Sequence, residues 1–415
     1  MYHNQKFQHY IQGRREQAMR QKHFNQFGLT RVRLNDKEVG QYFRSVGRKY
    51  QIRFVVLNDK SKANKLTADL LNKKYTLTDL SQVAVFGKLP AETELGFFDD
   101  MDPAVHQNLF ANPLREKQVI GPLKTIDNQY LIMEVNGWTD RLTLSDQAQQ
   151  NQWNDVRNRV IEYRAQDKYR EYVGRLMKGK EVHFDETTFR QLTEILMPVY
   201  IKTPAEKKDM LNSAVWNKET PDTAMDNFSA KIEKLKDQPF FTIDGETWTV
   251  ANFDVALQSH PLVFRQQTIE ASDFPRQFQL AVVDLIRDQY ITADAYKRRL
   301  DRAPDVQRYT QMWADNLVAL YYKQNYLSSV GLPIGFGADP VTAIENYLNP
   351  LVDNLQAKYA PEIAIDIGAF EKIQLTRIDL VAIQNNVPYP IVVPHFPLIT
   401  TDHLLDYGHQ LDHNE

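Results

Sequence analysis

The sequence contains no cysteine, which excludes disulfide bonds, thiolate metal ligands and a cysteine nucleophile. Glycine and proline are also few, 16 and 19 among 415 residues, and this excludes a collagen-like or low-complexity chain. No apolar run approaches the roughly 18 residues that a membrane-spanning helix needs. The first residues lack the apolar stretch of a signal peptide, so we expect a cytosolic protein or one whose export signal lies outside this sequence.

What the sequence does contain is ordinary globular composition, with 42% hydrophobic and 25% charged residues, at a length typical of two or three domains. The net charge of −3 conceals a basic N-terminal part, because residues 1–74 hold 17 Lys and Arg against 5 Asp and Glu. A basic segment can indicate nucleic-acid binding. These charges alternate with apolar residues at helical spacing and accompany no nucleic-acid motif. We therefore expect solvated helix faces or a docking surface, and no nucleic-acid partner.

Local patterns predict a compact α+β unit over residues 48–137. Residues 50–57 alternate and then become apolar, which indicates a strand, and residues 61–73 have helical spacing. A short helix includes Val105, and residues 130–135 form the second clear strand, closed by Asn136-Gly137. Before this unit, residues 2–28 read as one or two amphipathic helices, and Asn35 with Glu38 has the spacing of a capping box.

Beyond residue 138 the pattern is mainly helical. A long run from Trp153 to Leu176 ends at Gly179, and a further helix ends before Pro198. A weakly periodic connector contains one helix near 205–216, and Asp244-Gly245 predicts the turn of a hairpin. Aromatic-rich helices follow. The expected segments are helical 1–47, α+β 48–138, a helical arm with connector 139–238, a helical domain opened by a hairpin 239–330, and a helix with a Pro-rich tail 331–415.

The order of elements in the α+β unit resembles that of a parvulin-type peptidyl-prolyl isomerase domain. The matching motifs are Glu94-Leu95-Gly96-Phe97-Phe98, Met101 with Phe110 nine residues later, and Gly121-Pro122-Leu123-Lys124-Thr125 before the last strand. With helices on both sides, the chain resembles SurA-type periplasmic chaperones, over about 90 residues well and over more of the chain loosely. The resemblance implies an α+β, mainly helical multidomain chain with one small mixed-sheet domain.

The chain departs from the family at the positions that carry the catalytic histidines of active parvulins. Active parvulins carry one histidine in the first strand and one in the last, facing each other, and here these positions are assigned to Phe54 and Tyr130. The pocket phenylalanine of the family is Val105. Two interpretations stay open: the rings simply fill the old site, or the site still presents an apolar groove to client segments. The expected binding residues are Phe54, Leu95, Phe97, Met101, Val105, Phe110 and Tyr130.

Other clusters carry weaker signals. Asp402, Asp406, His409 and His413 would share one side of a helix and could hold a divalent metal, but a polar terminus explains them as well. Gly335-Phe336-Gly337 lacks the context of a nucleotide fingerprint, and no hydrolase motif occurs. The prolines of residues 387–399 exclude an interior strand and suggest a tail that covers a core edge or a strap that docks on a partner.

We therefore expect an ATP-independent chaperone or scaffold that binds extended apolar-aromatic segments of unfolded or partly folded polypeptides, without a cofactor or metal. An active prolyl isomerase with unusual site chemistry and a purely structural assembly subunit are the alternatives. A homo-oligomer or a partner chaperone is left open. The resemblance implies a periplasmic or otherwise exported protein, with the cytoplasm as the alternative.

Overall fold

The computed structural model describes most of the chain, namely residues 5–99, 101–125, 128–201, 232–266, 269–332, 340–364, 366–373, 388–389, 393–394 and 396–400. The helix expected near 205–216, the loop at 335–337 and the acidic and histidine residues of 402–413 lie outside these ranges. Among the described helices, none combines the length and the apolar character required to cross a membrane.

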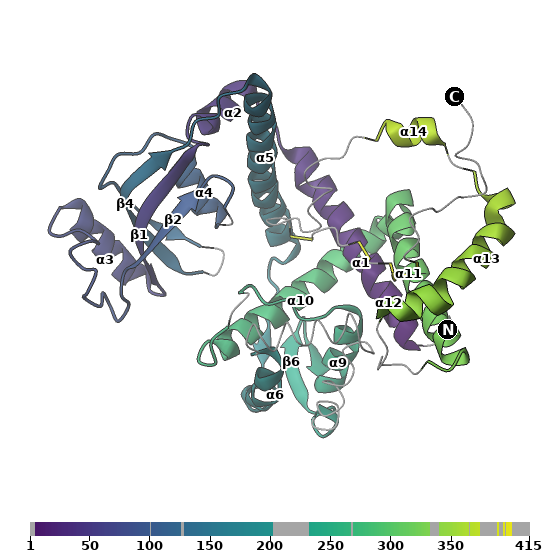
Figure 1. The fold of residues 1–415 in the computed structure, drawn as a ribbon. Coiled ribbons are helices and arrows are strands. Elements are labelled where there is room, and N and C mark those ends of the chain that lie inside the picture. Colours follow the sequence, from purple (N-terminus) through teal and green to yellow (C-terminus); the bar gives the residue numbers. More distant parts are fainter. Residues whose placement is uncertain are drawn as a thin grey trace. The chain divides into compact units, whose positions relative to one another are not determined.

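Contacts divide the chain into two compact units. One comprises residues 24–172 with 385–388 and is called the sheet unit here. The other comprises residues 1–23, 173–384 and 389–415 and is called the helical unit. Both contain helices and antiparallel strands, and the chain as a whole is mainly helical, as expected from its sequence (Figure 1).

The sheet unit contains four strands and several helices. Two of the strands were predicted from the sequence, and the other two are additional to the predicted order of elements. Its elements are η1 (Leu29–Arg31), α2 (Asp36–Phe43), β1 (Arg48–Leu57), α3 (Lys60–Leu71), β2 (Ala91–Gly96), α4 (Pro103–Phe110), β3 (Val119–Lys124), β4 (Tyr130–Asp140) and most of α5 (Asp146–Leu176).

The four strands lie in the order β2-β1-β4-β3, and all of their ladders are antiparallel. The sequence predicted a mixed sheet and only the two central strands, β1 and β4. Both missed strands are edge strands. β2 is largely exposed and lacks apolar alternation, while β3 contains Gly121-Pro122, which an edge position tolerates. Because edge strands are only partly buried, these two lack the apolar alternation by which a strand is recognised in a sequence.

The strand β4 does not end at Asn136-Gly137, as predicted, but continues to Asp140. The pairing shifts there, because Gln51 lies opposite Gly137 whereas the next residue, Ile52, lies opposite Val135. Asn136 is thus the extra residue of a β-bulge. A turn-like dipeptide here bends a strand instead of closing it.

The predicted capping box at Asn35 and Glu38 is confirmed, and the structure adds a cap at Asp59. The Asn35 side chain accepts a hydrogen bond from the Glu38 backbone at 3.0 Å, and the Glu38 carboxylate accepts one from the Asn35 backbone at 3.1 Å. The Asp59 side chain caps α3 by accepting from the Lys62 backbone at 3.0 Å. These bonds satisfy donors that helix termini leave open, and they need only neighbouring residues.

The sheet separates two apolar cores, and α3 and α4 lie on its opposite sides (Figure 1). On one face, Val55, Leu57 and Ile132 pack against α3. On the other face, Tyr50, Ile52 and Met133 pack with the aromatic residues around α4 and with α5. The alternation of β1 and β4 sends successive side chains to opposite cores.

The helical unit begins with the larger part of α1 and contains a second, three-stranded sheet of order β5-β6-β7. Its other main elements are β5 (His183–Phe184), α6 (Glu186–Tyr200), β6 (Pro239–Ile243), β7 (Glu246–Thr249), α9 (Val250–Ser259), α10 (Phe274–Lys297), η2 (Leu300–Arg302), α11 (Pro304–Ser329), α12 (Pro340–Ala343), η3 (Ile344–Leu348), α13 (Asn349–Tyr359), η4 (Ala360–Glu362) and α14 (Ile367–Glu371).

The predicted hairpin is confirmed, with Asp244 and Gly245 both at positive φ between β6 and β7. The prediction that α6 ends before Pro198 is wrong, because the helix continues to Tyr200. Pro198 lies in the last turn, where only one backbone bond is lost. The Tyr200 ring packs on Phe264 with centroids 4.8 Å apart, and this contact helps to hold the final turn.

Within the helical unit, α1 (Gln5–Phe27) lies against α10 and the end of α9 (Figure 1). Arg20 donates to the Thr292 hydroxyl at 3.0 Å, and Tyr296 donates to Glu16 at 3.3 Å. Gly13 makes the closest approach, since a Cβ at this position would lie well inside van der Waals contact of the Ser259 carbonyl oxygen. Glycine is therefore required where α1 crosses the end of α9.

We expect Gly13→Ala to destabilise the helical unit by about 1–3 kcal/mol, because the added methyl group must displace backbone atoms. Gly174→Ala in α5 is the matched control: its Cβ meets nothing within 4 Å, and alanine favours a helix by up to about 1 kcal/mol. Urea unfolding with hydrogen exchange read in α1 and α9 measures both changes. Equal behaviour of the two variants would contradict the close approach.

Candidate functional site

The face of the sheet that carries α4 holds a group of apolar side chains in two layers. The lower layer is fully buried: Phe97, Val105 and Phe110 are 1%, 4% and 0% exposed. Phe97 and Phe110 meet edge to face with centroids 5.3 Å apart, a favourable geometry for aromatic rings. These three predicted binding residues therefore form the floor of the site and are not themselves open to a ligand.

The upper layer is half-buried. Phe54 from β1, Leu95 from β2 and Met101 before α4 pack against the buried cluster that contains the floor residues, and they keep part of their surface open. Val56 and Leu123, which the sequence did not single out, are half-buried in the same cluster. We call Phe54, Val56, Leu95, Met101 and Leu123 the apolar rim.

Tyr130 is not part of this group. It packs with Val55 and Leu57 in the core on the α3 face of the sheet. The residue of β4 that shares the face of Phe54 is the next one, Leu131, which pairs with Val56 and is 8% exposed. Because strand side chains alternate between faces, an assignment one residue away places the side chain in the opposite core. With either Tyr130 or Leu131 assigned, the last strand places no histidine opposite the first strand.

The only histidine of the sheet unit, His106, lies beneath the floor and was missed by the sequence analysis. It is 2% exposed, and its ring lies 4.5 Å from Phe97 and 4.4 Å from Tyr163, measured between centroids. Its Nε2 lies 3.2 Å from the Phe97 carbonyl oxygen. Burial, with a smaller effect of the nearby Arg159 charge, lowers the His106 pKa to about 3. The sequence did offer one signal for His106, because it lies one residue after Val105 and four before Phe110, two residues already assigned to the site.

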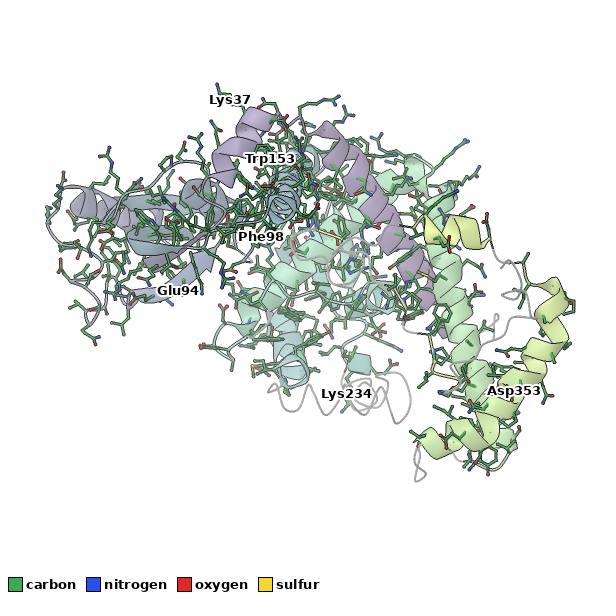
Figure 2. The ribbon with its side chains drawn as sticks, turned by 45° about the horizontal axis from the view of Figure 1, so that its top comes forward. Lys37, Glu94, Phe98, Trp153, Lys234 and Asp353 are labelled. Carbon is green, nitrogen blue, oxygen red and sulfur yellow. The ribbon has the colours of Figure 1, made fainter. Side chains whose placement is uncertain are left out.

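Charged residues lie along the exposed edge strand, on the face of the sheet opposite the rim, because strand side chains alternate between faces. Lys49 pairs with Glu94 at 2.8 Å, and Arg53 pairs with Glu92 at 2.6 Å. Hydrogen bonds from Lys49 and Gln51, with the Lys49 charge, lower the pKa of Glu94. Figure 2 labels Glu94 and, just beyond the end of β2, Phe98, which is 45% exposed. The edge strand thus carries paired charges on one face, and the exposed Phe98 ring follows at its end.

The chemistry open to the rim is limited to apolar contact. Its five side chains carry no titratable group, and the one nearby imidazole is buried under the floor as a neutral ring. Within the described residues, no cluster of three or more metal-ligating side chains occurs. The five rim side chains can contact an apolar side chain, and they themselves carry no acid, base or nucleophile.

A second cluster, which the sequence analysis also missed, lies in the helical unit around Asp288 of α10. Asp288 accepts hydrogen bonds from the Tyr389 hydroxyl at 2.8 Å and from Arg287 at 2.9 Å, and it pairs with His260 at 3.1 Å. Arg20 of α1 lies 3.9 Å away. Although burial opposes ionisation, these partners hold the Asp288 pKa far below its usual range. The cluster joins segments from both ends of the chain and reads as structural.

Comparisons with family models, curated proteins and solved structures find no match for this chain. The case for a function therefore depends on the geometry above.

Proposed function

We propose that the protein is an ATP-independent chaperone or scaffold, similar to SurA-type proteins, that binds extended apolar-aromatic segments of unfolded clients. The observation that carries this proposal is the half-buried apolar rim, whose five side chains carry no titratable group, packed against a buried aromatic cluster. Such a surface suits an apolar side chain of a client. It does not suit a reaction that needs proton transfer.

The expected affinity is low. Each client side chain buried on the rim contributes about 25 cal/mol per Å² of apolar surface, and binding costs translational and conformational entropy. A few such contacts give weak and reversible association. Because apolar burial is not directional, many client sequences can use the same surface.

The resemblance to a parvulin domain supports the same proposal. In that family, paired histidines organise the proline pocket, and here the corresponding face holds Phe54 and Leu131. The barrier to prolyl rotation is about 18–20 kcal/mol, and lowering it requires polar contact with the twisting amide. We therefore propose an inactive parvulin-like domain. Export from the cytosol and unfolded polypeptides as partners are part of the proposal through the same resemblance.

A paired assay tests the proposal. One preparation is assayed for suppression of aggregation of a urea-unfolded membrane protein and for isomerisation of an Xaa-Pro peptide. We expect suppression without added ATP and no isomerisation above the uncatalysed rate. Rapid isomerisation would favour an active enzyme with unusual site chemistry. A negative result in both assays would favour a purely structural subunit.

Met101→Asp should weaken client binding about tenfold, because it removes apolar surface from the rim and places a charge there. Leu144→Asp is the matched control, since Leu144 is 87% exposed and lies outside the rim. Anisotropy of a fluorescent unfolded client measures both affinities, and circular dichroism checks folding. Equal losses in the two variants would mean that exposed apolar residues act without regard to position, and would argue against the rim.

A further inference from the structure

The helical unit contains two adjoining hollows of about 500 Å³ and 290 Å³. Both are lined by Gln12 of α1, Ser259 at the end of α9 and Gln289 of α10. Because they share these three residues, the hollows adjoin each other, and we call them together the α1–α10 groove. Its larger part alone falls within the volume range of ligand-binding clefts.

The groove has well-defined walls. On α1 it is lined by His9, Gln12, Glu16 and Arg20, whose spacing of three and four residues places them on one helix face. The α10 wall includes Thr292 and Tyr296, which are hydrogen-bonded to Arg20 and Glu16 respectively. Gly13 of α1 approaches the backbone of Ser259, which lines both hollows. These contacts preform the groove.

The length of the groove suits a short extended segment. His9 and Arg20 are eleven residues apart on α1, which corresponds to about 16 Å along the helix axis. An extended chain advances about 3.3 Å per residue. About five residues of extended polypeptide therefore span the lined helix face.

The hydrogen-bonding groups of the groove match a peptide backbone. Side-chain amides donate and accept, as peptide groups do. In the described part of the chain, the Gln289 amide has no hydrogen-bond partner, and Gln12 uses its NH₂ group on Glu16 at 2.9 Å while its carbonyl oxygen stays available. Asn252 accepts two bonds from Thr249 and keeps its NH₂ group for the groove.

Trp248 supplies an apolar surface in the larger hollow. Phe241 is stacked on one face of its indole ring, with centroids 5.2 Å apart, and Trp248 lines the larger hollow. Val255 and Ala256 line the same hollow. A flat aromatic or aliphatic side chain would pack there.

The charges disfavour an anionic ligand such as a nucleotide. Glu246 and Glu16 line the groove, and the charge of Arg20 is already balanced by Asp288. A neutral or basic peptide segment meets no such repulsion.

We propose that the α1–α10 groove is a second client site, which binds about five residues of extended polypeptide through the amides of Gln12 and Gln289 and one flat apolar side chain on Trp248. This inference rests on the proposed function and adds a site in the helical unit, where hydrogen bonds to the client backbone complement the apolar contacts of the rim.

Photo-crosslinking in the full chain tests the groove. A benzophenone amino acid replaces Val255, which lines the groove and is 58% exposed, or Val263, which is 65% exposed and does not line it. The probes are the urea-unfolded membrane protein and a synthetic pentapeptide with a central tyrosine. We expect crosslinks to both probes at position 255, at several times the yield at 263. Equal yields at the two positions would overturn the proposal.

Gln289→Leu should lower pentapeptide affinity about fivefold, the effect of one lost hydrogen bond, while Gln289→Asn should restore part of it. An unchanged affinity of Gln289→Leu would overturn the role of the amide. Trp248→Phe keeps a ring on Phe241 and reports the stacking contribution separately. Suppression of aggregation with crosslinks no stronger at 255 than at 263 would reject the groove and leave the proposed function standing. Pentapeptide crosslinks at 255 without suppression would keep the groove and reject the chaperone activity.

Discussion

Asp288→Asn is expected to destabilise the helical unit by about 3–5 kcal/mol. Asp288 and the neighbouring Arg20 have side chains only 8% and 6% exposed, and the carboxylate also receives bonds from Arg287, His260 and Tyr389. The amide keeps the shape of the group but removes its charge, so buried cationic groups lose their counter-ion. The cost of an uncompensated buried charge exceeds the gain of a typical hydrogen bond several-fold.

The matched control is Asp305→Asn. Asp305 of α11 pairs with Lys22 at 2.7 Å, and Lys22 lies in α1, the helix that also carries Arg20. The Asp305 side chain, however, is 52% exposed. An exposed pair contributes at most about 1 kcal/mol. Urea unfolding, followed by hydrogen exchange in α1 and α10, compares the variants at pH 7. Similar losses for the two substitutions would contradict the burial of the Asp288 cluster.

The pH dependence of the Asp288 effect has a definite sign. The pKa of this group is lower in the folded than in the unfolded protein, so its stabilisation is present above the unfolded value of about 3.9 and is lost as the pH falls below it. The difference between the native protein and Asp288→Asn should therefore be full at pH 7 and smaller at pH 3.

The sheet unit should lose about 2 kcal/mol of stability between pH 7 and pH 5 because of His106. Its folded pKa of about 3 lies below the unfolded value of 6.5, so the neutral ring is the folded form. As the pH falls below 6.5, the unfolded chain binds a proton that the folded unit excludes, and each pH unit costs about 1.4 kcal/mol.

His106→Gln tests the origin of this slope. The variant has no titratable group at the site and can still donate to the Phe97 carbonyl oxygen, so we expect lower stability at pH 7 through lost ring contacts but a flat profile from pH 7 to pH 5. His183→Gln, which changes an exposed histidine of the helical unit, is the control and should leave the slope of the sheet unit unchanged. Hydrogen exchange in β1 and β4 reads this unit specifically. A persistent slope in His106→Gln would show that other groups are responsible.

Both predictions concern residues that sequence patterns did not identify. Asp288 occurs in a regular helical pattern, and nothing local distinguishes it from a solvated acid. Its importance arises because Arg20 and Tyr389, 268 and 101 residues away along the chain, are brought to it. His106 likewise became notable only when the rings of Phe97 and Tyr163 were found around it.

For the apolar rim too, the sequence predicted part of the site and only the tertiary structure showed the rest. The sequence predicted a common site for Phe54, Leu95 and Met101, and the structure places them in one cluster. It did not predict that Tyr130 faces the other core while Leu131 faces Phe54. In a strand buried on both faces, both sets of residues are apolar, so the pattern does not reveal which residue faces which core.

By itself the sequence determined the local features of this protein: the Asn35 capping box, the central strands β1 and β4, the turn at Asp244-Gly245 and the end of a long helix before Gly179. Each depends on residues a few positions apart, whose backbone preferences and capping bonds are set by their neighbours. Only the tertiary structure decided which edge strands join the sheet, which charges are buried together and how α1 lines a groove with α10. Those outcomes depend on packing between distant segments, because burial and ion pairing take effect only where the fold brings such segments into contact.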